Sequence, residues 1–262
     1  MTDYNTCTHF DLWQTIRAET TAAANAEPML ASFLHLTVLR HDSLASVLAF
    51  HLSSKLSSPI MDARALFEVY LQALAADTSI IEAVQCDLLA CYERDPACDE
   101  YSLPLLYFKG FHAIQAHRIN HWLWNNGRKT LAYFLQNRMS EVFGTDIHPA
   151  ARFGRGLMLD HATGFVVGET AVLGNDISIL HGVTLGGSGK ESGDRHPKVG
   201  DGVMIGANAS VLGNIRIGNW SKIGAGSVVV ADVAEHTTVV GVPAKPTGKA
   251  ANMPAAEMDQ RI

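Results

Sequence analysis

The residues best suited to acid–base chemistry lie just past the middle of the sequence. His161 stands in the run Asp-His-Ala-Thr-Gly at 160–164, and an imidazole with a usual pKa of about 6.5 can act as a base near neutral pH. Asp146 and Glu169 are nearby carboxylates that could hold the ring in one tautomer. Taken alone, such a histidine is more often a solvated surface residue. The three residues form our hypothesis for a catalytic base and its orienting groups.

A second candidate group closes the segment 186–198, which reads Gly-Gly-Ser-Gly-Lys-Glu-Ser-Gly-Asp-Arg-His-Pro-Lys. Its glycines and charges are typical of a loop. Arg195 carries a guanidinium whose planar fork matches a carboxylate, and His196 follows it directly. We favour a functional loop over a merely mobile excursion.

The region that must position these residues contains a repeat with a period of six. A helix of 3.6 residues per turn does not explain this period, and neither does a two-residue strand alternation. A triangular parallel coil does, with three six-residue flats per turn and glycines at the corners. The two apolar ladders are Ile147, Phe153, Leu159, Phe165, Ala171, Ile177 and Val183, and then Val199, Ile205, Val211, Ile217, Ile223 and Val229.

The two ladders are out of phase with each other. Val183 and Val199 are 16 positions apart, which is one hexapeptide plus ten residues. We therefore expect ten residues to leave the coil as a loop, which carries the 13-residue run 186–198.

The first half of the chain carries apolar residues at spacings of three and four, which predicts helices. Asp62 is a predicted N-cap, Ser79 with Glu82 a capping box, and Pro104 a first-turn residue. The expected helices cover 29–39, 44–56, 63–75, 80–92, 105–124 and 131–143. The sequence thus predicts an α+β protein: a helical domain at 1–143, a parallel β-helix at 144–246 and a flexible tail at 247–262.

Composition narrows the function classes. The chain of 262 residues has a formal net charge of −6 and a pI near 6.0, which disfavours an electrostatic grip on nucleic acid or an anionic membrane. Residues 1–11 lack the apolar core of a signal peptide, and no run reaches the roughly 18 apolar residues of a membrane span. We expect a cytoplasmic protein with no nucleic-acid or membrane partner. Reduced thiols are expected at Cys7, Cys86, Cys91 and Cys98.

Several motifs together resemble the serine O-acetyltransferase family. In the repeat region these are Asp-Ile-His-Pro at 146–149, Leu-Asp-His-Ala-Thr-Gly at 159–164, Val-Gly-Glu-Thr at 167–170, Val-Thr-Leu-Gly-Gly at 183–187 and Gly-Asp-Arg-His-Pro-Lys at 193–198. Elsewhere they are Arg-Asp-Pro-Ala at 94–97, Leu-Leu-Tyr-Phe-Lys-Gly-Phe-His at 105–112 and Gly-Val-Pro-Ala-Lys at 241–245. The resemblance covers about residues 10–248. It alone implies that the β-helix is left-handed, because general rules favour right-handed crossovers.

The resemblance implies transfer of an acetyl group from acetyl-CoA to the hydroxyl of L-serine, the first step of cysteine biosynthesis from serine. In this family His161 would take the hydroxyl proton and Asp146 would orient its ring. The substrate-binding residues that the resemblance implies are Arg195 and His196 for the serine carboxylate, and Asp95 and Asp160 for its ammonium. The serine site would then be shared between domains or subunits, because Asp95 lies in the helical domain.

For coenzyme A, the resemblance implies a groove between neighbouring β-helices. The lining residues that it implies are Gly187, Ala207, Lys222 and Ala225. No permanently bound cofactor is expected. Small residues also suit tight corners and a lysine is often only solvated, so each position has a structural explanation as well.

The resemblance further implies a homotrimer or a dimer of trimers, and feedback inhibition by L-cysteine. In this family a flexible tail that ends in isoleucine docks into O-acetylserine sulfhydrylase, and this chain ends in Ile262. We therefore expect that enzyme as a partner, against the simpler reading of a disordered terminus.

Three other functions fit parts of the pattern. A sugar or xenobiotic O-acetyltransferase would use a histidine on the same scaffold, but the long helical domain and Asp95, Arg195 and His196 speak against it. A zinc-dependent hydratase of the carbonic anhydrase type would use His161, His181 and His196 as ligands, although no spacing supports their convergence. A non-catalytic scaffold that regulates the sulfhydrylase is the third.

Overall fold

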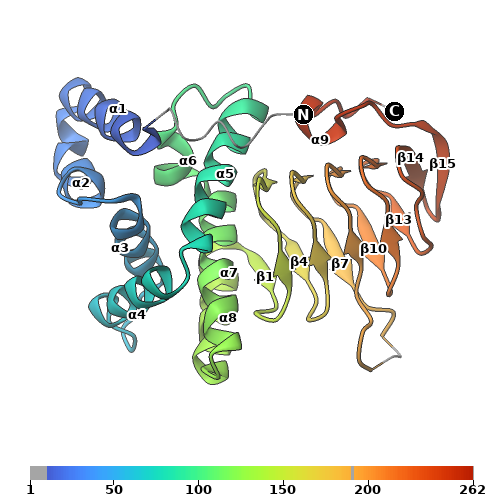
Figure 1. Ribbon diagram of the computed structural model, residues 1–262, viewed down its shortest axis with the longest axis horizontal. Helices are drawn as coiled ribbons and strands as arrows, with labels where there is room; N and C mark the ends of the chain where they lie inside the picture. The colour runs from blue at the N-terminus through green and yellow to red at the C-terminus, as the bar shows by residue number, and fades with distance from the viewer. Residues whose placement is uncertain (1–10, 190–191, 262) are drawn as a thin grey trace. The chain divides into compact units, whose positions relative to one another are not determined.

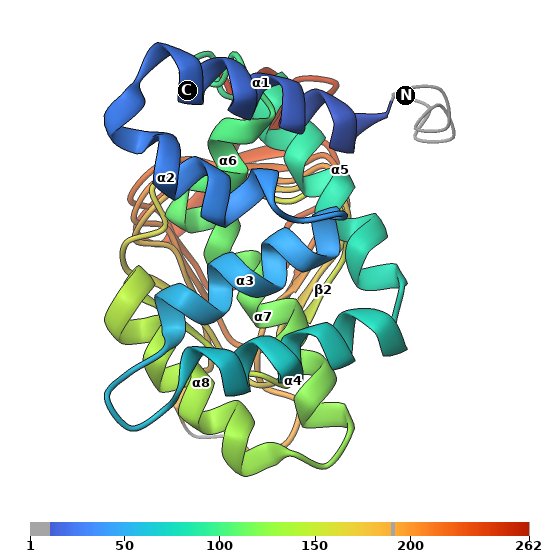
Figure 2. The same cartoon turned by 90° about the vertical axis from the view of Figure 1, so that its left-hand side faces the viewer.

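The computed structural model describes residues 11–189 and 192–261, and the chain divides after Phe108 into two compact units. The first unit is built of helices, of which α3 and α4 pack side by side (Figure 2). Its elements are α1 (Leu12–Ala26), the 3-10 turn η2 (Pro28–Leu30), α2 (Ala31–Leu34), the π-helical turn η3 (His35–Leu39), α3 (Leu44–Leu56), α4 (Ala63–Ala76), α5 (Ser79–Arg94) and α6 (Ser102–Tyr107).

Side-chain caps account for some helix starts and correct one prediction. The carboxylate of Asp62 accepts from the backbone N–H groups of Arg64 and Ala65 at 2.9 and 3.1 Å, which confirms its predicted role at α4. The predicted capping box at Ser79 is wrong, because Ser79 is the first residue of α5 and forms its cap contact with Asp77. The carboxylate of Asp77 accepts from the Ser79 backbone N–H at 3.1 Å and from its hydroxyl at 2.6 Å.

The helix predicted over 105–124 is two helices. Phe108 adopts an extended backbone, with φ −84° and ψ 106°, and ends α6. α7 (Lys109–Asn125) then starts the second unit and is followed by α8 (Lys129–Phe143). None of the helices in the described part of the chain is long and apolar enough to span a membrane.

The rest of the second unit is a parallel β-solenoid with three faces, as the period of six predicted (Figure 1). The β1 sheet contains β1 (Thr145–Ile147), β4 (Phe165–Val167), β7 (Thr184–Gly186), β10 (Ser210–Leu212) and β13 (Val228–Val229). The β2 sheet contains β2 (Arg152–Phe153), β5 (Val172–Leu173), β8 (Lys198–Val199) and β11 (Arg216–Ile217). The β3 sheet contains β3 (Met158–Leu159), β6 (Ser178–Ile179), β9 (Met204–Ile205), β12 (Lys222–Ile223), β14 (Thr237–Gly241) and the antiparallel β15 (Ala244–Lys249).

The strand register corrects the phase of the predicted ladder. Parallel pairing aligns Ile147 with Val167, Val167 with Leu185, and Leu185 with Val211. The predicted ladder ran two positions early over the second coil. The reason is that each hexapeptide also buries the residue two positions before the ladder residue, as Phe165 before Val167, exposed by 0% and 2%.

The same correction shortens the extruded loop. Leu185 and Val199 are 14 positions apart where the equivalent Val167 and Leu173 are six apart, so eight residues leave the coil rather than ten. The coil from β1 to β4 has 20 residues where the next has 18, and its two extra residues enlarge the turn 160–164. Both irregularities carry candidate site residues.

The helices of the second unit cover the first coil, with α7 against β3 and α8 against β1. An uncovered first coil would present unpaired edge strands. Side chains of α7 satisfy its backbone: His117, Arg118 and His121 donate to three carbonyl groups of residues 149–154 at 3.1, 2.7 and 2.8 Å. Gly110 permits the close approach, because a Cβ there would lie 1.9 Å from the carbonyl oxygen of Leu159.

The segment after β15 follows the β3 sheet and includes the short helix α9 (Pro254–Glu257). The hydroxyl of Ser178 donates to the carbonyl of Ala255 at 2.8 Å, and the amine of Lys222 donates to the carbonyl of Arg261. The predicted tail therefore contacts the solenoid up to residue 261. Ile262, on which the predicted partner interaction depends, lies outside the described residues.

Candidate active site

The candidate residues of the solenoid gather at two of its corners. The turns that lead from the β3 sheet into the β1 sheet, including 160–164, form what we call the His161 corner. The turns that lead from the β1 sheet into the β2 sheet, including 168–171 and the loop 186–198, form the Arg195 corner. β4 separates the two turns of the second coil, so the corners lie at opposite edges of the β1 sheet.

His161 projects from a turn with an unusual backbone. Both His161 and Ala162 have φ of +60°, a region that residues with a Cβ rarely adopt. The His161 side chain is 73% exposed, and its Nε2 lies 3.6 Å from Oδ2 of Asp160. The imidazole is thus open to a substrate and has a carboxylate beside it.

Lys109 and Thr163, which sequence reasoning missed, help to hold this turn in place. The amine of Lys109, at the start of α7, donates to the hydroxyl of Thr163. The backbone N–H of Gly182, one coil later, donates to the carbonyl of Thr163 at 2.8 Å. Lys109 and Thr163 both stand in motifs that carried the family resemblance, but nothing in their spacing indicated that they meet.

The His161 corner carries a column of stacked residues. Strand pairing in the β3 sheet aligns Leu159, Ile179, Ile205 and Ile223. The residues two positions after each of these are therefore also aligned from coil to coil. The column consists of His161, His181, Ala207 and Ala225. Two of the four residues expected to line a coenzyme A groove therefore stand directly in line with His161. The ring centroids of His161 and His181 are 5.8 Å apart with an interplanar angle of 69°.

Lys222 lies on β12, three positions before Ala225, and it is not simply solvated. It is 9% exposed, and its amine contacts the C-terminal segment at Arg261. A cavity of about 280 Å³ lies here, and its lining includes Lys222, Lys249, Arg261, Glu257 and Asp259. Three cations face this cavity together with two carboxylates.

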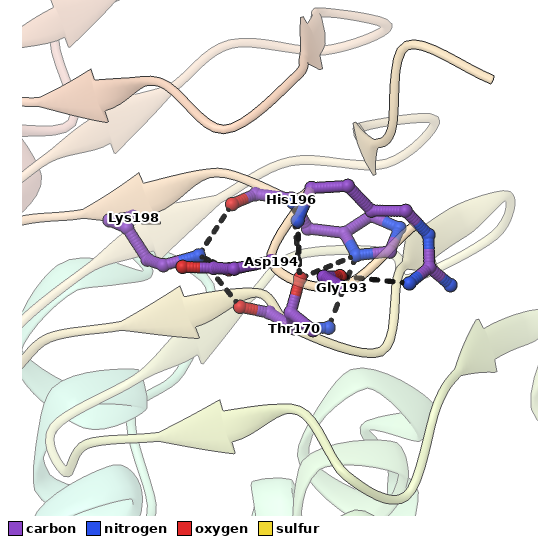
Figure 3. A network of polar contacts seen from close by, with 6 residues as sticks. Thr170, Gly193, Asp194, His196 and Lys198 are labelled. Carbon is purple, nitrogen blue, oxygen red and sulfur yellow. Dashed lines mark hydrogen bonds and ion pairs between the residues drawn. The ribbon is translucent and has the colours of Figure 1, made fainter. Parts of the chain in front are cut away.

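At the Arg195 corner, His196 is buried and held by Thr170 (Figure 3). Its Nδ1 lies 3.1 Å from the backbone nitrogen of Thr170 and 2.9 Å from the Thr170 hydroxyl. A backbone N–H can only donate, so Nδ1 is the acceptor and the neutral ring carries its proton on Nε2. Burial, followed by the guanidinium of Arg195, lowers the pKa of His196. The ring is therefore a neutral Nε2–H donor.

Thr170 and Lys198 fasten the closing end of the loop, as Figure 3 shows. The hydroxyl of Thr170 accepts from the backbone N–H groups of Arg195 and His196 at 3.0 and 3.1 Å. The amine of Lys198 donates to the carbonyls of Thr170 and His196 at 2.9 and 2.7 Å and pairs with Asp194. Sequence reasoning assigned neither residue a role, although both stand in motifs of the resemblance.

Glu169 belongs to the Arg195 corner. Its carboxylate pairs with Nη2 of Arg195 at 2.9 Å, with side chains 40% and 29% exposed. Nη1 of Arg195 donates to the carbonyl of Gly193 at 3.0 Å. Within one chain Glu169 therefore orients the guanidinium, whereas the sequence hypothesis had placed it with His161.

Gly187 also lies at the Arg195 corner. A Cβ at Gly187 would stand 3.4 Å from both the Arg195 carbonyl oxygen and Nε2 of His196. Of the residues expected to line a coenzyme A groove, this glycine is thus the one placed away from the His161 corner.

Asp146 points outward from β1 between the two corners. Its carboxylate accepts from Nε2 of Gln136 at 2.7 Å, and in the described part of the chain no hydrogen bond joins it to His161. Burial lowers the pKa of His148, while the carboxylates of Glu169 and Asp146 act in the opposite direction. Within its own chain, the hydrogen bond of the Asp146 side chain is thus to α8 rather than to the candidate base.

Asp95, expected to bind an ammonium group, lies in the first unit at the end of α5. Its carboxylate accepts from the backbone N–H of Ala97 at 2.9 Å, and its backbone N–H donates to Cys91 at 3.0 Å. The side chain is half-buried in a turn that leaves the helix.

Comparisons with known proteins agree along almost the whole chain. The family model described as serine acetyltransferase, N-terminal, matches residues 12–116, and the model of bacterial transferase hexapeptide repeats matches residues 196–231. The serine acetyltransferase of Escherichia coli strain K12 is 59% identical over 252 residues, which cover 96% of this chain and 92% of the relative.

Solved structures extend the likeness to the fold. Serine acetyltransferase of Neisseria gonorrhoeae in complex with serine is 81% identical, covers 90% of this chain and 98% of that chain, and has a TM-score of 0.89. The serine acetyltransferase of Brucella abortus strain S19 in complex with coenzyme A is 50% identical, covers 93% of this chain and 98% of that chain, and has a TM-score of 0.91. A serine acetyltransferase in complex with cysteine is 55% identical, covers 96% of this chain and 98% of that chain, and has a TM-score of 0.95. This chain belongs to the serine acetyltransferase family.

Proposed function

We propose that this chain transfers the acetyl group of acetyl-CoA to the hydroxyl of L-serine, which yields O-acetyl-L-serine and CoA and begins cysteine biosynthesis from serine. The observation that carries the proposal is that the solenoid presents an exposed imidazole at one corner and an oriented guanidinium at the opposite corner. Relatives solved with serine and with coenzyme A support the same pair of substrates.

The chemistry assigned to the His161 corner is general base catalysis. The imidazole of His161 removes the serine hydroxyl proton as the oxygen attacks the thioester carbonyl carbon. Asp160, 3.6 Å away, stabilises the imidazolium that forms. When the tetrahedral intermediate collapses, the carbon–sulfur bond breaks and His161 returns the proton to the CoA thiolate. Orientation of the ring by Asp146 stays a prediction.

Recognition of L-serine is assigned to charges of both signs. Glu169 and Gly193 hold the guanidinium of Arg195 in one orientation, and Thr170 holds His196 with Nε2–H as its donor. Together they would bind the serine carboxylate, because pre-positioned donors lose little entropy on binding. Asp160, with Asp95 from the first unit, is proposed to bind the ammonium.

These assignments require more than one chain. The corners stand at the two ends of one flat of the solenoid, which contains the strand β4. A flat of six residues, at about 3.3 Å per residue, spans up to roughly 20 Å, far beyond the length of one serine. A heterologous contact in which the His161 corner of one chain meets the Arg195 corner of the next closes into a ring. We therefore propose a homotrimer, or a dimer of such trimers, with one serine site at each junction.

The same arrangement accounts for the expected coenzyme A residues. Lys222, Ala207 and Ala225 lie at or beside the His161 corner, whereas Gly187 lies at the Arg195 corner that would face it. A pantetheine arm between two solenoids would touch both sets. Acetyl-CoA is then a co-substrate rather than a resident cofactor.

Three further assignments accompany this function. L-cysteine carries the same ammonium and carboxylate as L-serine, and a relative is solved with cysteine, so we propose that it competes at the serine site. O-acetylserine sulfhydrylase is the proposed partner of the C-terminus through Ile262. The proposed location is the cytoplasm.

The reaction is tested with purified full-length chain, acetyl-CoA and a thiol reagent. Thiol release should depend on L-serine and should fall when L-cysteine is added. Release that is independent of serine, or that appears only with a sugar acceptor, would contradict the proposal.

The shared site is tested by co-expressing two inactive chains, His161→Ala and Arg195→Ala. In mixed trimers about one junction in four combines an intact His161 with an intact Arg195, so roughly a quarter of the normal activity should return. If both residues acted within one chain, no mixture would recover activity.

A further inference from the structure

The turn that carries His161 has a different backbone from the equivalent turns of the later coils. Each of those turns contains one residue in the left-handed region, with φ of 71°, 58° and 67° at Gly182, Asn208 and Gly226. The first turn has Gly164 at the equivalent position, with φ of 78°. It adds His161 and Ala162, both with φ of +60°. The candidate base thus belongs to an extra pair of left-handed residues.

This pair needs support from its surroundings. The backbone N–H of Ala162 donates to the carbonyl of Asp160, and that of Thr163 donates to the carbonyl of His161, both at 2.7 Å. Each bond closes a three-residue turn around a residue with positive φ, and such turns are rare and strained. A strained backbone persists only where neighbouring groups hold it. The direction of the His161 side chain therefore depends on contacts that fix the pair from outside.

Thr163 and Lys109 supply such a contact. The hydroxyl of Thr163 accepts from the amine of Lys109, and it forms a long hydrogen bond of 3.4 Å to the carbonyl of His161. An ammonium group can only donate, so the Thr163 oxygen is the acceptor and its own hydrogen is left for the carbonyl. Hydrogen bonds from a charged donor are stronger than those between neutral groups. The side chain and the backbone N–H of Thr163 are therefore both held against the His161 carbonyl.

The backbone of Lys109 is itself fixed relative to this turn. Lys109 is half-buried and begins α7, and the next residue, Gly110, lies directly against the solenoid. A Cβ at Gly110 would stand 1.9 Å from the carbonyl oxygen of Leu159, which precedes His161 by two positions. The amine thus reaches Thr163 from a helix that is packed on the strand leading into the turn.

We propose that Lys109 is a positioning residue for the reaction: through Thr163 it holds the left-handed pair and so fixes the direction of the His161 imidazole. This assignment rests on the proposed function and deepens it. Misplacing a reacting group by about 1 Å can cost about 100-fold in rate. The serine carboxylate and coenzyme A are assigned to other residues, so the link should affect the chemical step far more than the binding of substrates.

The test uses full-length Lys109→Met, which keeps the stem and removes the amine, and Thr163→Val, which removes the hydroxyl. Each should lower kcat about 10- to 100-fold while the KM values for serine and acetyl-CoA change by less than about threefold. The double variant should lose no more than the weaker of the two single variants, because both changes break the same link. Lys109→Arg and Thr163→Ser keep a charged donor and a hydroxyl, and they should recover most of the loss.

Lys129→Met is the matched control. Lys129 begins α8 as Lys109 begins α7, but its amine lies over the ring of Trp124, 4.6 Å from the centroid. This variant should keep kcat and both KM values. Thermal melting and size-exclusion elution check that every variant is folded and assembled, and Thr163→Val measures the same link if Lys109→Met does not assemble. The rate of thiol release in the first turnover shows whether the chemical step itself is slowed.

Three outcomes would overturn the assignment. The first is a loss in kcat of less than about fivefold in folded Lys109→Met or Thr163→Val. The second is a KM that rises more than about tenfold in Lys109→Met alone, which would show that the amine binds a substrate directly. The third is a double variant in which the two losses multiply. A wild type that releases no thiol in response to serine would instead overturn the proposed function itself.

Discussion

The backbone N–H and the hydroxyl of Thr170 both lie within hydrogen-bond distance of Nδ1 of His196, at 3.1 and 2.9 Å. The same hydroxyl accepts from the backbone of Arg195. One threonine thus fixes the tautomer of one site residue and the position of another. We expect Thr170→Val to raise the KM for serine about tenfold, because a loosened loop loses pre-positioned donors.

Thr170→Ser is the matched control, because it keeps the hydroxyl and should keep the KM for serine. The KM for acetyl-CoA should stay unchanged in both variants. Steady-state kinetics with each substrate varied in turn would show this. An equal effect of Val and Ser would contradict a role for the hydroxyl.

Gly168 gives His196 the space that its ring occupies. A Cβ at Gly168 would lie 2.0 Å from both Cδ2 and Nε2 of His196. Gly168→Ala should therefore displace the imidazole and weaken serine binding, measured as a higher KM for serine. Gly248→Ala, where a Cβ meets nothing within 4 Å, is the control that should leave the KM for serine unchanged.

Arg195 and Glu169 form an ion pair that orients more than it stabilises. Their side chains are 29% and 40% exposed, and exposed pairs contribute about 0–1 kcal/mol to folding. Glu169→Gln should thus leave the Tm nearly unchanged but raise the KM for serine. Arg195→Lys should raise that KM further, since an ammonium lacks the planar fork. A large fall in Tm with unchanged kinetics would show a structural role instead.

His161 is assigned as the base, so His161→Ala should lower kcat about 100- to 10,000-fold while the oligomer elutes unchanged. Asp146→Asn tests the orienting role and should lower kcat with little change in either KM. Gln136→Ala removes the Asp146 partner seen here, and it should leave kcat nearly intact if Asp146 acts on His161. A His161→Ala variant with near-full activity would remove it from the role of base.

His51 links stability to pH. Burial, followed by the charge of Lys55, lowers the pKa of His51 to about 4, and the ring contacts the Leu106 carbonyl through Nε2 at 3.1 Å. The unfolded chain binds a proton below about pH 6.5 whereas the folded chain does not. Protonation of His51 therefore does not affect the free energy of unfolding above pH 6.5. As the pH falls from 6.5 toward 4, it lowers that free energy by up to on the order of 3 kcal/mol.

His51→Gln keeps a donor for Leu106 but cannot titrate. Its Tm should match the wild type at pH 7 and fall less steeply between pH 6.5 and 4.5. Thermal melts across this range would measure the difference. Parallel Tm curves for the two proteins would assign the acid sensitivity to other groups.

The six-residue period was enough to predict a parallel solenoid, because inward side chains must recur once per flat. Apolar spacings of three and four were enough to predict the helical region before it. The phase of the six-residue period could not be predicted in this way. Phe165 and Val167 are both buried, so an apolar ladder fits either position, and only the pairing of Val167 with Leu185 decides between them. The sequence therefore predicted that ten residues leave the coil, whereas eight do so in the structure.

For the candidate site, too, the sequence identified individual residues, whereas only the structure showed which of them make contact. The sequence alone singled out His161, Arg195 and His196, because an imidazole can act as a base near neutral pH and a guanidinium matches a carboxylate. It could not show that Glu169 contacts Arg195, that Thr170 holds His196, or that the rings of His181 and His161 meet edge to face. Those contacts join residues 20 to 26 positions apart. Coil length and loop insertions set such pairings, and the packing of one coil on the next determines both.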